Sequence, residues 1–124
     1  MKNILGCLLA VTAGVALASD ATLDSWHAFY ARYTIFSGPT LADSEAPTQT
    51  DRKLAILVEG QTAKNIFDSI GPDAAPVCSQ EKGDRERAKE GVQCTYTAGG
   101  KNKGFNCWIG INLRTGKSIA TVSC

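Results

Sequence analysis

Residues 52–72 read RKLAILVEGQTAKNIFDSIGP and divide into two halves of different periodicity. Leu54–Val58 is apolar at every position, which is typical of a central strand covered on one side by a helix. In the second half apolar residues recur at i, i+3, i+4 and i+7, which predicts a helix with one apolar face. That face consists of Ala63, Ile66, Phe67 and Ile70. We expect Thr62 to cap the start of the helix and Gly71-Pro72 to end it.

The segments on either side of this unit predict further strands. Residues 29–37 are rich in aromatic and β-branched side chains and predict a strand that ends at Ser37-Gly38-Pro39, whereas residues 19–30 suit either a helix or a strand. Residues 38–51 are rich in turn-forming and acidic residues and predict a loop. Downstream, DRERAKEGVQCTYT (84–97) begins charged and becomes β-like, which is typical of a strand at the solvated edge of a sheet.

The order of elements is strand, strand, helix and then three strands. Strands that follow one another along a chain tend to be neighbours in the sheet. The expected fold is therefore α+β, a small antiparallel sheet of about five strands with one helix packed on one face. It would form a single disulfide-stapled domain over residues 19–124.

Residues 1–18 have the features of a secretory signal peptide. Lys2 supplies the positive start, an apolar stretch follows, and Ala16-Leu17-Ala18 is a small-x-small cleavage site. The apolar stretch is shorter than the roughly 20 residues that a membrane-spanning helix needs. A lipoprotein signal ending at Cys7 is the rival interpretation, but it leaves only six residues for the whole signal. We expect a periplasmic or secreted protein without a membrane span.

The distribution of charge argues against nucleic acid as a partner. Without the signal the chain has 12 basic and 12 acidic residues, so it offers no net positive field to a phosphate backbone. The acidic residues lie mainly before residue 82 and the basic ones after it, which predicts an acidic end or face and a basic one.

The closing segment, CWIGINLRTGKSIATVSC (107–124), contains the GKS of a phosphate-binding loop. Such a loop needs four residues between its first glycine and the Gly-Lys pair, and a helix after them. Here five residues separate Gly110 from Gly116, and the SIATVSC that follows is typical of a strand. The segment instead predicts a hairpin with a two-residue turn at Thr115-Gly116, which places Cys107 opposite Cys124.

The four cysteines that follow the signal are Cys78, Cys94, Cys107 and Cys124. An even number in a small exported chain predicts two disulfides formed in an oxidising compartment. The hairpin register favours Cys107–Cys124, which leaves Cys78–Cys94. The alternative is Cys94–Cys107 with Cys78–Cys124, because Cys94 also faces Cys107 if the glycine-rich turn between them is centred on Gly100-Lys101. A two-residue turn fixes register better than a long one, so we prefer the first pairing.

The sequence contains no recognisable catalytic or metal site. The single histidine, His27, has no nucleophile motif to serve, and the cysteines lack the CxxC spacing of zinc sites. Glu59 at a strand end and Asp68 on the helix are carboxylates outside any motif. We therefore expect no enzyme, no cofactor and no metal. The alternatives are a small envelope hydrolase with an unrecognised carboxylate site and a structural envelope protein.

The hairpin side chains that point away from the core suit a protein partner. Tryptophan and arginine are over-represented among binding hot spots. The charged strand adds a basic row that can attract an acidic partner. The candidate partner-binding residues are Trp108, Asn112, Arg114, Lys117, Arg85 and Arg87.

Residues 115–119, Thr-Gly-Lys-Ser-Ile, are similar to the S-G-x-x-Y loop of some lysozyme inhibitors, with Thr in place of Ser and Ile in place of Tyr. In format the chain resembles the small periplasmic inhibitor and immunity proteins of Gram-negative bacteria. The resemblance implies an exported, disulfide-bonded, β-rich domain that blocks a hydrolase with a loop. We expect a secreted periplasmic protein-binding module, an inhibitor or immunity protein against a cell-wall hydrolase or toxin.

The first prediction concerns export. Mass spectrometry of the mature protein should show a chain that begins at Ser19 and carries no lipid, because the cleavage site precedes that residue. A diacylglyceryl mass on Cys7 would contradict both the signal and the number of cysteines left to pair.

Overall fold

The first two strands and the helix follow one another as expected from the sequence, but the later strands differ from the expectation. Residues 84–97, expected as one strand, form two, and residues 118–121, expected in a last strand, form only an isolated bridge at Ser118. The computed structural model describes residues 25–75 and 77–121, so the predicted signal peptide and Cys124 lie outside it. Residues 25–30 belong to no helix or strand. The elements are β1 (Ala31–Phe36), β2 (Lys53–Glu59), α1 (Gly60–Ser69), β3 (Arg85–Lys89), β4 (Val92–Thr97) and β5 (Gly104–Asn112).

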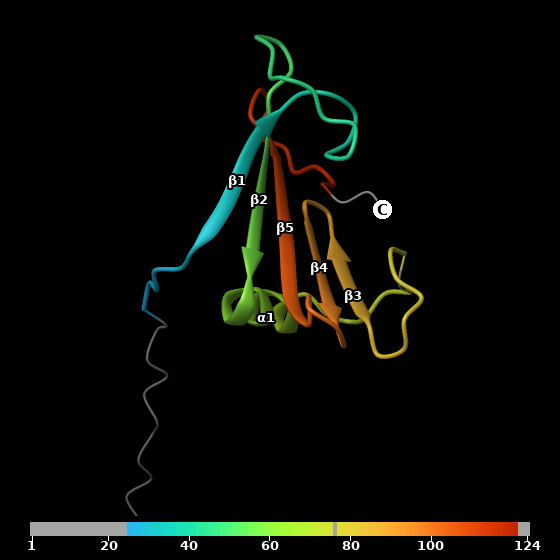
Figure 1. The fold of residues 1–124 in the computed structure, drawn as a ribbon. Helices are drawn as coiled ribbons and strands as arrows, with labels where there is room; N and C mark the ends of the chain where they lie inside the picture. Colours follow the sequence, from blue (N-terminus) through green and yellow to red (C-terminus); the bar gives the residue numbers. More distant parts are fainter. Residues whose placement is uncertain (1–24, 76, 122–124) are drawn as a thin grey trace, which may run out of the picture.

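The five strands form one antiparallel sheet with the order β1-β2-β5-β4-β3 (Figure 1). The helix follows β2 directly and packs on β5, β2 and β4. Figure 1 shows α1 across the lower ends of these strands, so on that side the upper part of the sheet is left without a helix among the described residues. The predicted α+β fold, one helix on one face of a five-stranded antiparallel sheet, is confirmed. No helix in the described part of the chain is long and apolar enough to cross a bilayer.

The core lies where α1 meets the middle of the sheet. Ala63 and Phe67, two residues of the predicted apolar face, are fully buried against Val58, Cys94 and Cys107. The Sγ atom of Cys107 lies 3.2 Å from the carbonyl oxygen of Ala63, so the helix backbone rests directly on the sulfur. The small side chain of Ala63 permits this close approach, and Phe67 fills the space beside it.

The helix ends where predicted, at Ser69 with Ile70 as the C-cap directly before Gly71-Pro72, but its start and the contacts that complete its end differ from the prediction. Thr62 is not the N-cap, because the helix begins at Gly60 and Glu59, three residues before Thr62, occupies the cap position and provides no side-chain cap hydrogen bond. Gly71 is not among the glycines with a left-handed backbone. Instead, Nη1 of Arg87 donates to the carbonyl oxygen of Phe67 at 2.8 Å, and a Cβ on Gly71 would lie 3.2 Å from that same nitrogen. A side chain from a distant strand thus completes the helix end.

The preferred disulfide pairing is wrong. Cys94 is joined to Cys107, which it faces directly across β4 and β5 with the two Cα atoms 4.0 Å apart. The turn between these strands has the register centred on Gly100-Lys101, so the alternative pairing is confirmed for these two residues. Cys78 is also disulfide-bonded. A cross-link of this kind contributes roughly 2–4 kcal/mol to the stability of a small domain.

The position of β5 explains why Cys107 does not pair with the C-terminal segment. β5 is central, with β2 along one edge and β4 along the other, and β4 places Cys94 at the position opposite Cys107. The C-terminal segment meets β5 only beyond the end of β4, where Ile111 forms an isolated bridge with Ser118. Up to Thr121, where the described chain ends, the predicted hairpin is therefore confined to this short bridge.

The turn that precedes the bridge is longer than predicted. The N–H of Asn112 donates to the carbonyl oxygen of Lys117 at 2.7 Å, and the N–H of Gly116 donates to that of Asn112 at 2.7 Å. Residues 113–116 thus form the turn instead of Thr115-Gly116 alone. Gly116 has a φ of +73°, a left-handed conformation that suits glycine. The register is displaced by two residues, so Ile111 and Ser118 still share a face as predicted.

Gly110 allows the chain after the bridge to cross close over β5. A Cβ on Gly110 would lie 2.3 Å from Cγ2 of Thr121 and 2.4 Å from the carbonyl oxygen of Ile119. The second contact is with backbone, which cannot rotate away as a flexible side chain can. The absence of a side chain at residue 110 therefore decides where residues 119–121 lie.

The second prediction tests this contact. Gly110→Ala should destabilise the domain by about 1–3 kcal/mol, because residues 119–121 must move away from the strand. The melting temperature should fall by roughly 4–8 °C per kcal/mol in a domain of this size. Gly99→Ala is the control, since a Cβ there meets no heavy atom within 4 Å. Equal melting temperatures for the two variants would contradict the packing described.

Candidate functional site

The face of the sheet opposite α1 is centred on Trp108. Successive side chains of a strand point to opposite faces, and Cys107 is buried beneath the helix, so Trp108 points the other way. It lies between Leu57 of β2 and Gln93 of β4 and is half-buried. Among the described residues no helix covers this face. As predicted, Asn112 lies on the same face as Trp108.

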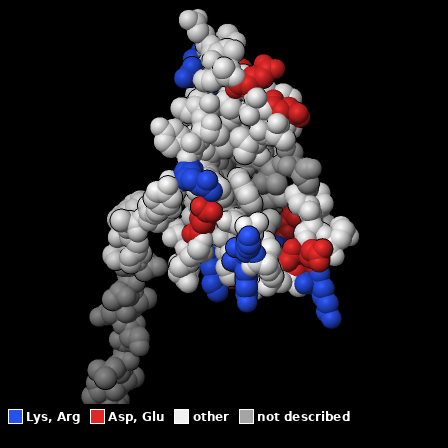
Figure 2. All heavy atoms as spheres, in the orientation of Figure 1, with Lys and Arg blue, Asp and Glu red and all other residues white. Residues whose placement is uncertain are grey.

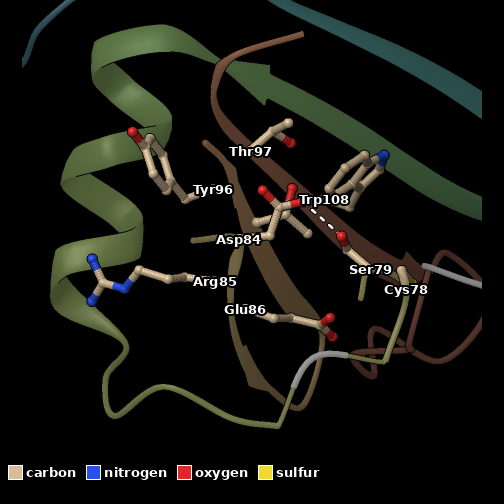
Figure 3. Close-up of a pocket in the computed structure, with 9 residues that line it drawn as sticks. Cys78, Ser79, Asp84, Arg85, Glu86, Tyr96, Thr97 and Trp108 are labelled. Atoms are coloured by element: carbon tan, nitrogen blue, oxygen red, sulfur yellow. Dashed lines mark hydrogen bonds between the residues drawn. The ribbon is translucent and has the colours of Figure 1, made fainter. Parts of the chain in front are cut away.

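A hollow of about 220 Å³ lies on one side of Trp108 (Figure 3). Figure 3 shows Asp84 and Glu86 on the same side of the sheet as Trp108, whereas Arg85 points toward the helix. Residues from the loop before β3 close the hollow, and hydroxyl groups of β4 form its floor. The lining on the Trp108 side comprises Cys78, Ser79, Asp84, Glu86, Thr95 and Thr97.

The carboxylate of Asp84 is held by two donors. The N–H of Ala98 donates to Oδ1 at 2.8 Å, and the hydroxyl of Ser79 donates to Oδ2 at 2.6 Å. These hydrogen bonds, with that of Ala98 the larger effect, lower the pKa of Asp84. The group is therefore an anion that fixes the loop and the β4 end to each other, and it is a poor general acid.

The carboxylate of Glu86 is buried, with only 5% of the residue exposed. The N–H of Val77 donates to Oε2 at 3.0 Å, and Nε2 of Gln93 donates to Oε1 at 2.6 Å. Each of its oxygens therefore already accepts a hydrogen bond, as buried polar groups require. Like Asp84, Glu86 holds the preceding loop against the sheet, and the two carboxylates give the hollow a fixed wall.

A second hollow, of about 200 Å³, lies on the other side of Trp108. Its walls are largely apolar, since the β1–β2 loop folds Leu41 over Ala55 and Leu57. Arg32 and Thr34 of β1 form the outer rim. Both hollows fall below the ~300–1,000 Å³ that is typical of sites for small molecules and cofactors.

The turn over residues 112–117 presents the other predicted binding residues. Oδ1 of Asn112 accepts a hydrogen bond from the N–H of Arg114 at 2.9 Å, which stiffens the turn. Arg114 and Lys117 are exposed. Trp108 lies four residues back along β5, roughly 13 Å away at the rise of a strand. The structure thus joins Asn112, Arg114 and Lys117 in one turn, with Trp108 farther along the same strand.

Arg85 and Arg87 lie on the opposite, helix-bearing face and do not belong to this site. Both bind Asp73, with nitrogen–oxygen distances of 2.7 and 2.6 Å. Their guanidinium carbons lie 5.0 and 4.3 Å from the ring centroid of Phe67. The Arg87 side chain is only 16% exposed, so the expectation of a solvated basic row is wrong for that residue. These arginines join β3, the helix end and the following loop.

The carboxylates considered as possible catalytic groups each pair with a nearby cation. Glu59 lies 3.4 Å from Arg32, and Asp68 binds Lys64 one helical turn away. That contact with Lys64 is the main cause of a lowered pKa at Asp68. Within the described ranges no group of three or more metal-ligating side chains occurs.

The distribution of charge follows the sequence trend only in part. In Figure 2 acidic side chains lie at the upper end of the view, where Figure 1 places the β1–β2 loop, and also in the lower half, where most basic side chains lie. The loop contributes Asp43, Glu45 and Asp51. Oδ2 of Asp51 accepts the N–H of Gly38 at 2.9 Å, so part of this charge closes the loop on itself.

A second surface was not anticipated from the sequence. Trp26, Phe29, Tyr30 and Tyr33 are 103%, 55%, 79% and 74% exposed, respectively, at and before the start of β1. We call residues 26–30 the aromatic arm. The density of aromatic residues in WHAFYARY was the available signal, but in isolation it indicates a buried strand as readily as an exposed one.

Comparisons with protein-family models, with curated proteins and with solved structures give no match for this chain. The resemblance to periplasmic inhibitors therefore stays a prediction from the sequence.

The third prediction concerns pH. Hydrogen bonds from Arg85 and then Arg87 lower the pKa of Asp73 from 3.8 to about 2. The stability that this contributes is present above pH 4 and is lost as the pH falls toward 2. Asp73→Asn should therefore lower the melting temperature at pH 5 more than at pH 2, as thermal melts across this range can show. Asp43→Asn, in the β1–β2 loop, is the control, and a constant difference between wild type and Asp73→Asn would contradict the assignment.

Proposed function

We propose that this protein is an exported protein-binding module, periplasmic or secreted, and that it binds its partner with the face around Trp108. The Cys94–Cys107 disulfide supports export, because such bonds persist in oxidising compartments. The predicted signal peptide supports the same compartment.

The observation that carries the proposal is the placement of Trp108. A half-exposed tryptophan stands at the centre of a face that no described helix covers, between two hollows of about 220 and 200 Å³. Hot spots in protein interfaces are typically aromatic anchors near the centre of the contact. Hollows of this size suit single side chains of a partner that straddles the indole ring.

The walls of the two hollows suit different contacts. The Leu41, Ala55 and Leu57 side is apolar and favours an aliphatic or aromatic side chain. The side with Ser79, Thr95 and Thr97 offers hydroxyl groups that can donate or accept hydrogen bonds. The face therefore combines an apolar anchor with polar groups that fix its orientation.

The partner class we propose is a cell-wall hydrolase or a toxin, with this protein as its inhibitor or immunity protein. Arg114 and Lys117 project from a turn that backbone and side-chain hydrogen bonds stiffen. Glycoside hydrolases place two carboxylates in their active-site cleft. A rigid cationic turn is complementary in charge to such a cleft and would enter it while Trp108 anchors the neighbouring surface.

The fourth prediction tests surface and target together. The mature protein should reduce the lysis of cell walls by purified lysozymes or by the cognate toxin. Trp108→Ala should weaken the complex by about 30-fold or more, as is typical for loss of a hot spot worth 2 kcal/mol. Arg114→Ala with Lys117→Ala should also weaken binding, while the melting temperature stays nearly constant because both side chains are exposed. Calorimetry and melting curves supply the two measurements.

Lys101→Ala with Lys103→Ala is the matched control. These two lysines are also exposed in a turn, but at the other end of β5. Full inhibition by a folded Trp108→Ala variant would exclude this face. If no hydrolase or toxin is inhibited, and cells that lack the gene survive the same challenge, the proposed target class is excluded.

A further inference from the structure

The outer edge of β1 carries backbone groups that bond to no strand of the described sheet. The N–H of Leu113 donates to the carbonyl oxygen of Arg52 at 2.9 Å, so even-numbered residues at this edge of β2 direct their backbone groups toward β5. The odd-numbered residues of β2 therefore bond to β1, where their partners are even-numbered. The residues of β1 whose N–H and C=O groups point outward are Ala31, Tyr33 and Ile35.

The loop after β1 limits how many residues of β1 can pair with an added strand. Ser37 exchanges two backbone hydrogen bonds of 3.0 Å with Glu45, which occupies the outward position next in sequence. An added strand can thus pair with three residues of β1 and no more at that end. Arg32 is the one charged residue of β1, so the edge lacks the lysines, prolines and bulges that commonly prevent edge-to-edge pairing.

The helix-bearing face has an apolar stripe that α1 does not cover. Ile35, Leu54 and Ile111 are aligned across β1, β2 and β5 on this face. They are half-buried, and none belongs to the residues that pack on the core. Leu54 lies four residues from the core residue Val58, roughly 13 Å along the strand. We call these three residues the apolar stripe.

The aromatic arm runs away from the apolar stripe of its own chain. The arm leaves β1 at Ala31, which is paired with Val58 at the helix end of the sheet. Figure 1 shows the chain leaving the lower end of β1, whereas the β1–β2 loop lies at the upper end. If a strand of a partner ran antiparallel to β1, the loop end of the partner strand would lie beside the Ala31 end of β1. The arm that leaves β1 at Ala31 would then lie next to the apolar stripe of the partner.

We propose that the partner is a second copy of this chain. The two β1 strands pair antiparallel, with Tyr33 opposite Tyr33 of the second copy. Each aromatic arm then covers the apolar stripe of the other copy. In this two-fold register Ala31 of one copy faces Ile35 of the other, so all outward groups of both edges are paired. Arg32 faces Thr34 of the second copy, so no like charges oppose each other. This interaction uses the β1 edge and the helix-bearing face, and it meets the face around Trp108 only at the rim of the second hollow, where Arg32 and Thr34 lie.

The dimensions of the arm fit this arrangement. Five extended residues reach about 17 Å. From Ala31, Ile35 of the second copy lies one strand spacing away, and its Leu54 and Ile111 lie two and three spacings away, or about 5, 10 and 15 Å. Four aromatic side chains bury about 600–1,000 Å² per copy, which matches the ~800 Å² per partner of a stable interface. The exposure of Trp26, Phe29, Tyr30 and Tyr33 in a single copy is thereby explained.

The fifth prediction tests this dimer with the mature chain. Light scattering after size-exclusion chromatography, at 10–100 μM protein, should give twice the mass of one chain. Tyr33→Pro should give a folded monomer, because the N–H that proline removes points outward and donates to no strand of the sheet. Alanine at Trp26, Phe29 and Tyr30 together should raise the dissociation constant at least tenfold. Thr34→Ala is the control and should remain a dimer, since its side chain lies on the other face.

A cross-linking pair tests the register and covers the case in which Tyr33→Pro fails to fold. Tyr33→Cys should form an inter-chain disulfide, because residues opposed in a hydrogen-bonded pair have Cα atoms about 5.5 Å apart. Arg32→Cys should not, since that residue faces Thr34 of the second copy. A monomeric wild type at 100 μM, a dimeric folded Tyr33→Pro variant, or cross-linking through residue 32 in place of 33 would each overturn the proposal.

Discussion

The cross-strand pair of Cys94 and Cys107 is the contact on which the rest of the structure depends. The two residues face each other at the centre of the sheet, and both are fully buried beneath α1. Their small side chains allow the backbone of Ala63 to approach to 3.2 Å from sulfur. The bond also fixes the register of β4 on β5, which the glycine-rich turn between these strands specifies only weakly. This disulfide therefore fixes both the register of β4 on β5 and the position of α1 on the sheet.

The face around Trp108 follows from the position of Cys107 beneath the helix and from the alternation of side chains along β5. Because Cys107 is directed at the helix, its neighbour must point to the opposite face, where no described helix covers the indole ring. β4 occupies the edge of β5 at Cys107, so the C-terminal segment can join β5 only beyond that point. Gly110 then lets this segment cross close above the strand. The open surface around Trp108 and the stiff turn with Arg114 thus arise from the same strand order.

The charged residues of β3 hold the fold together on both faces of the sheet. Arg85 and Arg87 join Asp73 and the Phe67 ring on the helix side, and Arg87 completes the last turn of α1. On the other face the carboxylate of Glu86 holds the preceding loop through the N–H of Val77. The charged side chains of β3, which the sequence suggests are solvated, therefore bond to the helix end on one face and to the preceding loop on the other. Arg114 and Lys117, by contrast, are exposed in the turn after β5 and are available to a partner.

Local periodicity by itself determined the α+β class of this protein, the apolar run at Leu54–Val58 and the helical stripe that contains Phe67, but it did not separate β3 from β4. Each of these signals depends only on residues close together in the chain, so one sequence is sufficient to predict them. The alternation along β5 likewise determined that Trp108 and Asn112 point away from the core. The helix caps were predicted less well, because Arg87 comes from a strand that is distant in sequence.

Only the tertiary structure decided which strands flank β5, and with it the disulfide. Two registers satisfied the local geometry of Cys107, and the choice depended on whether β4 or the C-terminal segment occupied the same edge. Whether β4 or the C-terminal segment pairs with this edge of β5 depends on the whole sheet, so the sequence of neither turn indicates which of them does. The roles of Arg85 and Glu86 and the exposure of the aromatic arm were decided in the same way. Whether a side chain at a sheet edge is solvated, bonded within its own chain or exposed to a partner depends on which other segments of the chain pack next to it.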